Sequence, residues 1–362
     1  MHVRWIGSAL ISTALLGCMN QDRYTEDQVL LSPKGVSETG FSYVNKEVLN
    51  LGWRVYKRNC AACHGDAGDG QGRAAPKLIP PPRDLTQGLF KFGGVVAGTG
   101  LPHDEDIERI LRDGLHGTGM LEWDIREGQL QPLIWFIKSL SEEGKGWRNA
   151  DAELGERIEI PKDPYAGNKS AQKEAADRGN ALYHADATCW KCHPAYESRE
   201  TIWDQAKTLG AGAPQFAADM YMSKPKESKY AISAKGNTGF EPGILSIMPP
   251  DFTMDEIRSG DGAAELYRVL SAGVDGSGMP SWREFYIDDI EKAEKGEGRD
   301  PIWDLVYYVM ELHNETTTED AVRKQAKHMA TLAAPWVAPS DKTQVDTNSP
   351  DDTAEATDSG QD

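Results

Sequence analysis

The chain contains the pentapeptide Cys60-Ala61-Ala62-Cys63-His64 and repeats its pattern as Cys189-Trp190-Lys191-Cys192-His193. In each copy two cysteines are spaced to lie on one helical turn, and a histidine follows the second cysteine directly. Two thiols at this spacing can form thioethers to the two vinyl groups of a porphyrin, and the adjacent imidazole can then bind its iron. The pattern therefore predicts two covalently attached haems c, held by Cys60, Cys63, Cys189 and Cys192, with iron ligands His64 and His193.

Two other kinds of site use a Cys-x-x-Cys pair, namely a zinc knuckle and a thioredoxin-like redox dithiol. The whole chain has five cysteines and eight histidines. Zinc needs four ligands per site, and neither alternative explains why a histidine follows both cysteine pairs. Haem attachment accounts for the whole pattern, and the two alternatives stay open at this point.

The fifth cysteine, Cys18, has a different setting. A short charged start is followed by an almost wholly apolar run, Trp5 to Gly17, which is too short to span a bilayer. This arrangement predicts a signal peptide over residues 1–17. The residues Leu15-Leu16-Gly17 before Cys18 resemble a bacterial lipobox, which implies lipidation of Cys18. The alternative is an ordinary signal peptide with an unpaired thiol.

A lipid on Cys18 implies an exported protein at the periplasmic face of a bacterial membrane. Met19 follows the cysteine, and by resemblance to Gram-negative lipoproteins this favours the outer membrane. Residues 18–45 are expected to form a polar tether. Residues 315–362 form a C-terminal extension, which we expect to be disordered from about residue 339 because it is rich in Asp, Thr and Ser.

The 362-residue chain carries a formal net charge of −18. This charge makes nucleic acid an improbable partner, because phosphate binding needs cations. An acidic surface can steer basic redox proteins toward it, or it can serve solubility alone.

The repeat extends beyond the two haem motifs. In each half a glycine precedes the motif, and a Pro-Pro step, a Gly-rich loop with a methionine and an aromatic helix follow it. The corresponding features are Gly52 and Gly179, Pro81-Pro82 and Pro249-Pro250, Met120 and Met279, and helices expected over 130–140 and 301–312. Four features in the same order indicate a duplication.

This order resembles class I c-type cytochrome domains over roughly residues 46–141 and 172–314. The resemblance implies an all-α fold of two tandem cytochrome c-like helical domains, joined by a polar linker over 142–171. In that family the first and last helices cross where a small residue faces an aromatic one. Gly52 and Gly179 would be the small residues. The aromatic partners would be Trp135 or Phe136 in the first domain and Tyr307 or Tyr308 in the second.

The two copies are unequal. The interval between haem motif and Pro-Pro step is longer in the second half, which predicts an insertion over about residues 195–243. This insertion either covers the haem edge or supplies a partner surface, or it is a surface excursion with its own small packing. The interval from Tyr183 to Cys189 also exceeds that from Tyr56 to Cys60, so we expect the second N-terminal helix to meet its haem in a different register.

Each iron needs a sixth ligand or leaves a position open. Thioether sulfur is a good iron ligand, and glycines in a loop let the backbone pass close to a porphyrin face. Met120 and Met279 each follow a Gly-rich loop and precede a tryptophan, so they are the predicted ligands. Rival ligands are Met220, Met222, Met248 and Met254 for the second iron, and His103, His116, His184, His313 and His328 for either.

Two further contacts with the first haem are expected. Arg83 is predicted to pair with a haem propionate, because guanidinium matches carboxylate in geometry. By resemblance to the family, the carbonyl of Pro76 or Pro80 would accept the remaining N–H of His64.

Two fully coordinated irons leave no position for a substrate. We therefore expect an electron carrier and not an enzyme, passing single electrons by outer-sphere transfer. Its partners would be donor and acceptor redox proteins, either basic-surfaced cytochromes or subunits of a membrane-bound respiratory complex. The alternative function is a dihaem peroxidase with one open coordination position. A dihaem thiosulfate-oxidising enzyme would use a cysteine ligand, and only Cys18 is left for that role.

Overall fold

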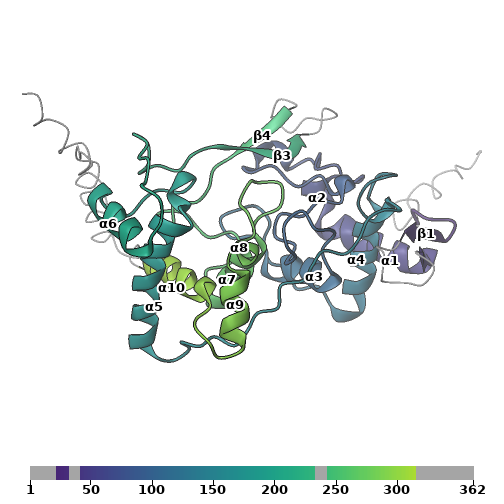
Figure 1. Cartoon of the computed structure of the whole chain (residues 1–362). Coiled ribbons are helices and arrows are strands. Elements are labelled where there is room, and N and C mark those ends of the chain that lie inside the picture. The colour runs from purple at the N-terminus through teal and green to yellow at the C-terminus, as the bar shows by residue number, and fades with distance from the viewer. Residues whose placement is uncertain (1–21, 32–40, 233–242, 315–362) are drawn as a thin grey trace, which may run out of the picture.

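The computed structural model describes residues 22–31, 41–232 and 243–314. Helices dominate this part of the chain, so the predicted all-α fold is confirmed (Figure 1). The strands of the described residues form two antiparallel hairpins, β1 (Gln28–Leu31) with β2 (Phe41–Val44) and β3 (Lys226–Ile232) with β4 (Gly243–Ile247). No helix in the same ranges is both long and apolar enough to cross a bilayer.

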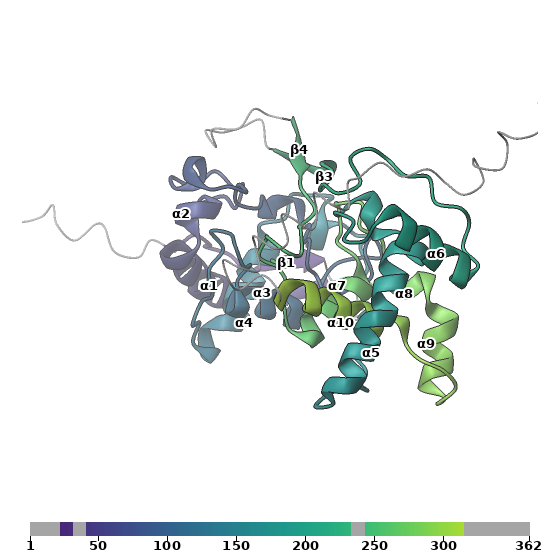
Figure 2. The same ribbon diagram turned by 90° about the vertical axis from the view of Figure 1, so that its left-hand side faces the viewer.

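Two helical units lie side by side in both views (Figures 1 and 2). We define the first unit as residues 46–141 and the second as residues 169–314. The first unit contains α1 (Lys46–Asn59), α2 (Ala61–His64), α3 (Asp104–Asp113) and α4 (Glu127–Ser139). The second contains α5 (Lys169–Ala181), α6 (Arg199–Leu209), α7 (Ala263–Ala272), α8 (Trp282–Phe285), α9 (Ile287–Glu294) and α10 (Pro301–Asn314).

Helix α1 leads directly into the first haem motif. The side chain of Asn45 accepts a hydrogen bond from the Val48 N–H and so caps the helix N-terminus. At the other end, Cys60 closes α1, and α2 carries the rest of the motif. The motif is thus placed by a capped helix that packs against α4.

The crossing of α1 over α4 depends on Gly52. A Cβ at this position would lie 2.1 Å from the carbonyl oxygen of Pro132 and 2.7 Å from the Cβ of Phe136, distances that no side chain tolerates. The Phe136 ring packs on that of Tyr56 with a centroid separation of 5.0 Å. Of the two predicted aromatic partners, the one at the crossing is therefore Phe136.

Helices α5 and α10 cross in the same way. A Cβ at Gly179 would lie 2.1 Å from the carbonyl oxygen of Asp304 and 2.8 Å from the Cβ of Tyr308. The aromatic residue at this crossing is Tyr308. Both predictions of a close helix crossing at a glycine are confirmed.

The prediction that the second N-terminal helix meets its haem motif in a different register is wrong. The Tyr56 hydroxyl donates to the carbonyl of Gly65, and the Tyr183 hydroxyl donates to the carbonyl of Pro194, each at 2.8 Å. Gly65 and Pro194 each follow the motif histidine, so the two tyrosines hold equivalent positions. The extra residues of the second copy form a π-helical turn, Leu182–Asp186, and a left-handed residue, Thr188 with φ 49°.

Each unit has its own hydrophobic core. The segment between the units, expected as a linker, packs along both: Trp147 is buried in the first core and Ile158 in the second. Two backbone hydrogen bonds join the units directly, from the Ala97 N–H to the carbonyl of Ala272 (2.8 Å) and from the His116 N–H to the carbonyl of Arg258 (3.1 Å).

Part of the segment expected as a tether packs on the first unit. The Asn50 side chain accepts hydrogen bonds from the N–H groups of Arg23 and Tyr24, at 2.8 and 2.9 Å. The guanidinium of Arg23 lies 4.9 Å from the ring centroid of Trp53. These residues are therefore folded against α1. Three expected features lie outside the described residues: the signal peptide, Cys18 and the C-terminal extension over residues 315–362.

The expected insertion contains α6, β3 and the first residue of β4, and its described part packs on the second haem motif. Met220 is fully buried in the second core, and its carbonyl accepts a hydrogen bond from Ala195 (2.7 Å). The Lys224 N–H donates to the carbonyl of Cys192 (2.9 Å), and the ring of Phe216 lies 6.0 Å from that of Trp190. The insertion is thus integrated with the motif and is not a separate excursion.

Candidate haem-binding sites

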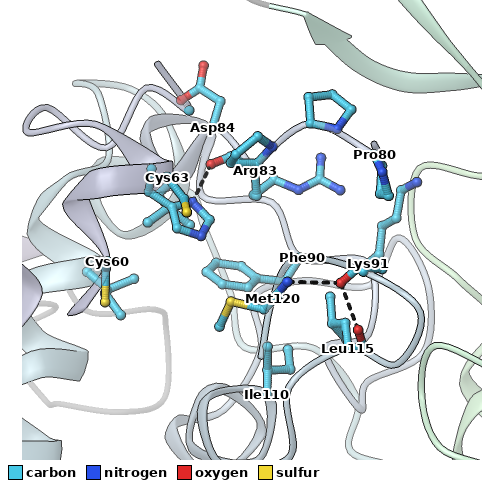
Figure 3. A pocket seen from close by; sticks show the side chains of 18 of the residues that line it. Cys60, Cys63, Pro80, Arg83, Asp84, Phe90, Lys91, Ile110, Leu115 and Met120 are labelled. Carbon is cyan, nitrogen blue, oxygen red and sulfur yellow. Dashed lines mark hydrogen bonds between the residues drawn. The ribbon is translucent and has the colours of Figure 1, made fainter. Parts of the chain in front are cut away.

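A cavity of about 380 Å³ lies between the first haem motif and the Gly-rich methionine loop (Figure 3). It is lined by all five residues predicted for this site: Cys60, Cys63, His64, Arg83 and Met120. Figure 3 shows Cys60 and Cys63 along one side and Met120 with Ile110 below them. The volume lies in the range of small-molecule and cofactor sites.

The ring of His64 is fixed by a backbone carbonyl. Its Nδ1 lies 2.9 Å from the carbonyl oxygen of Arg83, which can only accept, so Nδ1 carries the proton and Nε2 keeps the lone pair that can bind iron. Burial lowers the pKa of His64 and so favours the neutral ring. The prediction that Pro76 or Pro80 accepts this hydrogen bond is wrong, because the chain presents the carbonyl of Arg83 after the Pro-Pro step.

The second unit repeats this arrangement. Nδ1 of His193 lies 2.8 Å from the carbonyl oxygen of Pro250, the second proline of its Pro-Pro step. The next residue is an aspartate in both units, and each aspartate accepts hydrogen bonds from the backbone and hydroxyl of a threonine two residues on: Asp84 from Thr86, and Asp251 from Thr253. The turn that presents the carbonyl is therefore the same.

The methionine loop of the first unit is closed by its own hydrogen bonds. The Met120 N–H donates to the hydroxyl of Thr118 (3.1 Å), which donates to the carbonyl of Leu115 (2.7 Å), and the Leu115 N–H donates to the carbonyl of Met120 (2.8 Å). Gly114 has φ 67°, and a Cβ on it would lie 2.6 Å from the Met120 carbonyl oxygen. The loop therefore holds Met120 in a fixed position.

The second methionine loop has the same bonds. The Met279 N–H donates to the hydroxyl of Ser277 (3.2 Å), Ser277 donates to the carbonyl of Val274 (2.6 Å), and the Val274 N–H donates to the carbonyl of Met279 (3.1 Å). Gly273, with φ 74°, lies against the Met279 carbonyl as Gly114 does against that of Met120. Threonine and serine thus serve the same purpose in the two loops.

The four motif cysteines form no disulfide bond among the described residues. Burial, and then the neighbouring cysteine of the pair, raise the pKa of Cys60 and of Cys189 to about 12. A redox dithiol needs the opposite, a lowered thiol pKa that supplies thiolate. The described residues also hold no group of three His, Cys, Asp or Glu side chains placed to bind a metal ion. The donor set instead fits haem c: two thiols, an oriented imidazole and a thioether around an apolar cavity.

Several rival ligands are placed elsewhere by the structure. Met220 is buried in the core, whereas Met222, Met248 and Met254 are exposed on the surface. His184 is fully buried, with Nδ1 2.9 Å from the Asn180 carbonyl and Nε2 accepting from the Tyr196 N–H at 3.0 Å. Both of its nitrogens are therefore used inside the second unit. His328 lies outside the described residues.

The remaining histidines also have other surroundings. Nε2 of His103 lies 3.1 Å from the carbonyl of Gly155, and His313 lies beside Asp261. The His116 side chain is exposed, although its backbone contacts the second unit.

Two cations that were not predicted from the sequence also line the first cavity, namely Lys91 and Arg258. Lys91 stands between Phe90 and Phe92, a weak signal for a cavity wall. Arg258 comes from the second unit, and no local pattern could have placed it at the first site.

A family model described as "Cytochrome C oxidase, cbb3-type, subunit III" matches residues 47–137. This supports a c-type cytochrome. The matched range coincides with the first unit and implies haem c with its iron and a role in electron transfer. Among solved structures, the chain is similar to one from the "Kuenenia stuttgartiensis reducing HAO-like protein complex". The two chains are 28% identical, the match covers 72% of this chain and 95% of that chain, and the TM-score is 0.48. The search of curated proteins gave no match.

Proposed function

We propose that the chain is a dihaem electron-transfer protein. Haem c is attached at Cys60 and Cys63 in the first unit and at Cys189 and Cys192 in the second. The axial ligand pairs are His64 with Met120, and His193 with Met279. When bound, the haem irons supply the one-electron redox chemistry, and Met/His ligation raises their potentials.

The observation that carries this proposal is the repetition of one hydrogen-bond arrangement around both motifs. In each unit the carbonyl of the residue before an aspartate orients the histidine (2.9 and 2.8 Å), and a hydroxyl accepts from the methionine N–H (3.1 and 3.2 Å). Chemically similar residues thus hold a histidine and a methionine ready in both units. With two axial ligands supplied by the protein, neither iron has a position for substrate.

The protein's own contribution is positioning. The Nδ1–H bonds to Arg83 and Pro250 fix the imidazole tautomer and increase the basicity of Nε2. The rigid loops limit ligand movement between oxidation states. Burial of the core around each motif excludes water and so influences the potential.

We further propose that the protein works at the periplasmic face of a bacterial membrane, held there by a lipid on Cys18, with the outer membrane favoured. The formal net charge of −18 favours basic donor and acceptor proteins, because opposite charges raise association rates. A free-standing cytochrome or a subunit of a respiratory complex fits this description.

The ligand assignment is tested by replacing each methionine in turn. Met120→Ala and Met279→Ala should each remove about half of the sulfur-to-iron absorption and lower the potential of one haem. Met222→Ala is the matched control, because this side chain is 66% exposed, and it should change neither quantity. If Met279→Ala leaves the spectrum unchanged and the reduced protein turns over peroxide, the second iron has an open position and the carrier proposal is wrong.

A further inference from the structure

The first haem cavity is bordered by three cations in a chain that is acidic overall. Arg83, Lys91 and Arg258 all line it, whereas the chain has 57 Asp and Glu against 39 Lys and Arg. Figure 3 shows the side chains of Arg83 and Lys91 at the end of the cavity away from Cys60. Such a local excess of positive charge points to an anionic ligand at this end.

The three cations act on one another. Burial, and then the charges of Arg83 and Arg258, lower the pKa of Lys91 to about 8. Lys91 is therefore partly buried and lies close to two like charges.

Two carboxylates also line the cavity, and each accepts hydrogen bonds from its own turn. Asp84 accepts from the N–H and hydroxyl of Thr86 (2.9 and 2.5 Å) and from the amide of Gln87 (3.3 Å). Asp69 accepts from the Gln71 N–H (3.1 Å). Both aspartates thus stabilise local turns of the chain.

Arg258 belongs to the second unit and is firmly placed. Its carbonyl accepts a hydrogen bond from the His116 N–H (3.1 Å) in the loop that carries Met120. The preceding residue, Ile257, is 6% exposed, and a Cβ on Gly117 would lie 3.0 Å from the Cβ of Glu256. Residues 256–258 are therefore packed on the first methionine loop, and the Arg258 side chain reaches the cavity from there.

We propose that Arg258 binds a propionate of the first haem, together with Arg83 and Lys91, so that the second unit completes the haem site of the first. Guanidinium groups match carboxylates in geometry and charge, and a haem carries two propionates. This inference rests on the proposed function, because it needs haem at Cys60 and Cys63. The contact between the units then has a chemical role, because the charge of Arg258 in the second unit influences the reduction potential of the haem in the first.

The test is an optical redox titration of the full-length holoprotein carrying Arg258→Gln. Ferric haem carries one more positive charge than ferrous haem, so loss of a nearby cation favours the ferric form. We expect the ferric-to-ferrous ratio of the first haem to rise roughly tenfold at fixed electrode potential, which is about 59 mV for one electron. The couple of the first haem is assigned by its displacement in Met120→His. The second couple should stay in place.

Two variants serve as controls. Arg299→Gln removes the same charge from an exposed position of the second unit and should leave both couples unchanged. Arg258→Lys retains the charge and should restore most of the wild-type ratio. Equal potentials in Arg258→Gln and Arg299→Gln would overturn the inference. Peptide masses without haem at Cys60 and Cys63 would overturn the proposed function itself, and this inference with it.

Discussion

The most informative residues are those whose polar contacts decide between ligand and structural roles. His64 and His193 each donate Nδ1–H to a backbone carbonyl, which leaves Nε2 for iron. His184 uses Nε2 to accept from the Tyr196 N–H, so it has no nitrogen left for a metal. Two histidines close in sequence, His184 and His193, thus have different roles. The partner of Nε2 distinguishes the structural histidine from the proposed iron ligand.

The burial of His184 predicts a pH dependence of stability. Desolvation lowers its pKa from 6.5 to about 4. The unfolded chain therefore binds a proton between these values and the folded chain does not, so stability is complete above pH 6.5 and is lost as the pH falls toward 4. The effect of this one group is about 3 kcal/mol.

This dependence can be measured by urea unfolding between pH 7 and 4.5. The free energy of unfolding of the wild type should fall more steeply with acidification than that of His184→Gln, in which the group is absent. His116→Gln, at an exposed position, should retain the wild-type slope. Equal slopes in the wild type and His184→Gln would contradict the account.

At the scale of elements, the two helix crossings position the haem motifs. Each crossing brings a backbone carbonyl to where a glycine Cβ would be, 2.1 Å away at both Gly52 and Gly179. The helices could not approach so closely with any larger residue. This contact places Tyr56 at the end of α1, and Tyr183 in the π-helical turn that follows α5.

Gly52→Ala should destabilise the protein by about 1–3 kcal/mol, because the added methyl forces α1 and α4 apart. The matched control is Gly128→Ala in α4, where no atom lies within 4 Å of the added Cβ. This change should stabilise by about 0.5–1 kcal/mol through helix propensity. Thermal unfolding of both variants measures the difference, and a Gly52→Ala variant as stable as Gly128→Ala would contradict the crossing.

The elements also show what sequence could and could not predict. Repetition predicted the glycine crossings, the last helices and the methionine loops, because each depends on a local pattern. The register of α5 was predicted wrongly, since a π-helical turn absorbs extra residues without moving Tyr183. The carbonyl partner of His64 was also missed, because any residue can present a carbonyl and its side chain gives no signal.

On the scale of the whole molecule, the two units are in direct contact through backbone hydrogen bonds and through residues 256–258. A polar segment between them had suggested separate domains. Its buried side chains, Trp147 and Ile158, instead fasten it to both cores. Contacts of this kind join residues far apart in sequence, so no periodicity or motif could predict them.

The central claim is that both units bind haem c with two protein ligands to each iron. Its most direct test is an optical redox titration of the purified full-length protein, with a mass measurement that counts covalent haems. The account predicts two haems per chain and two couples at the high potentials typical of His/Met ligation. One haem per chain, or a high-spin or low-potential second haem, would contradict it.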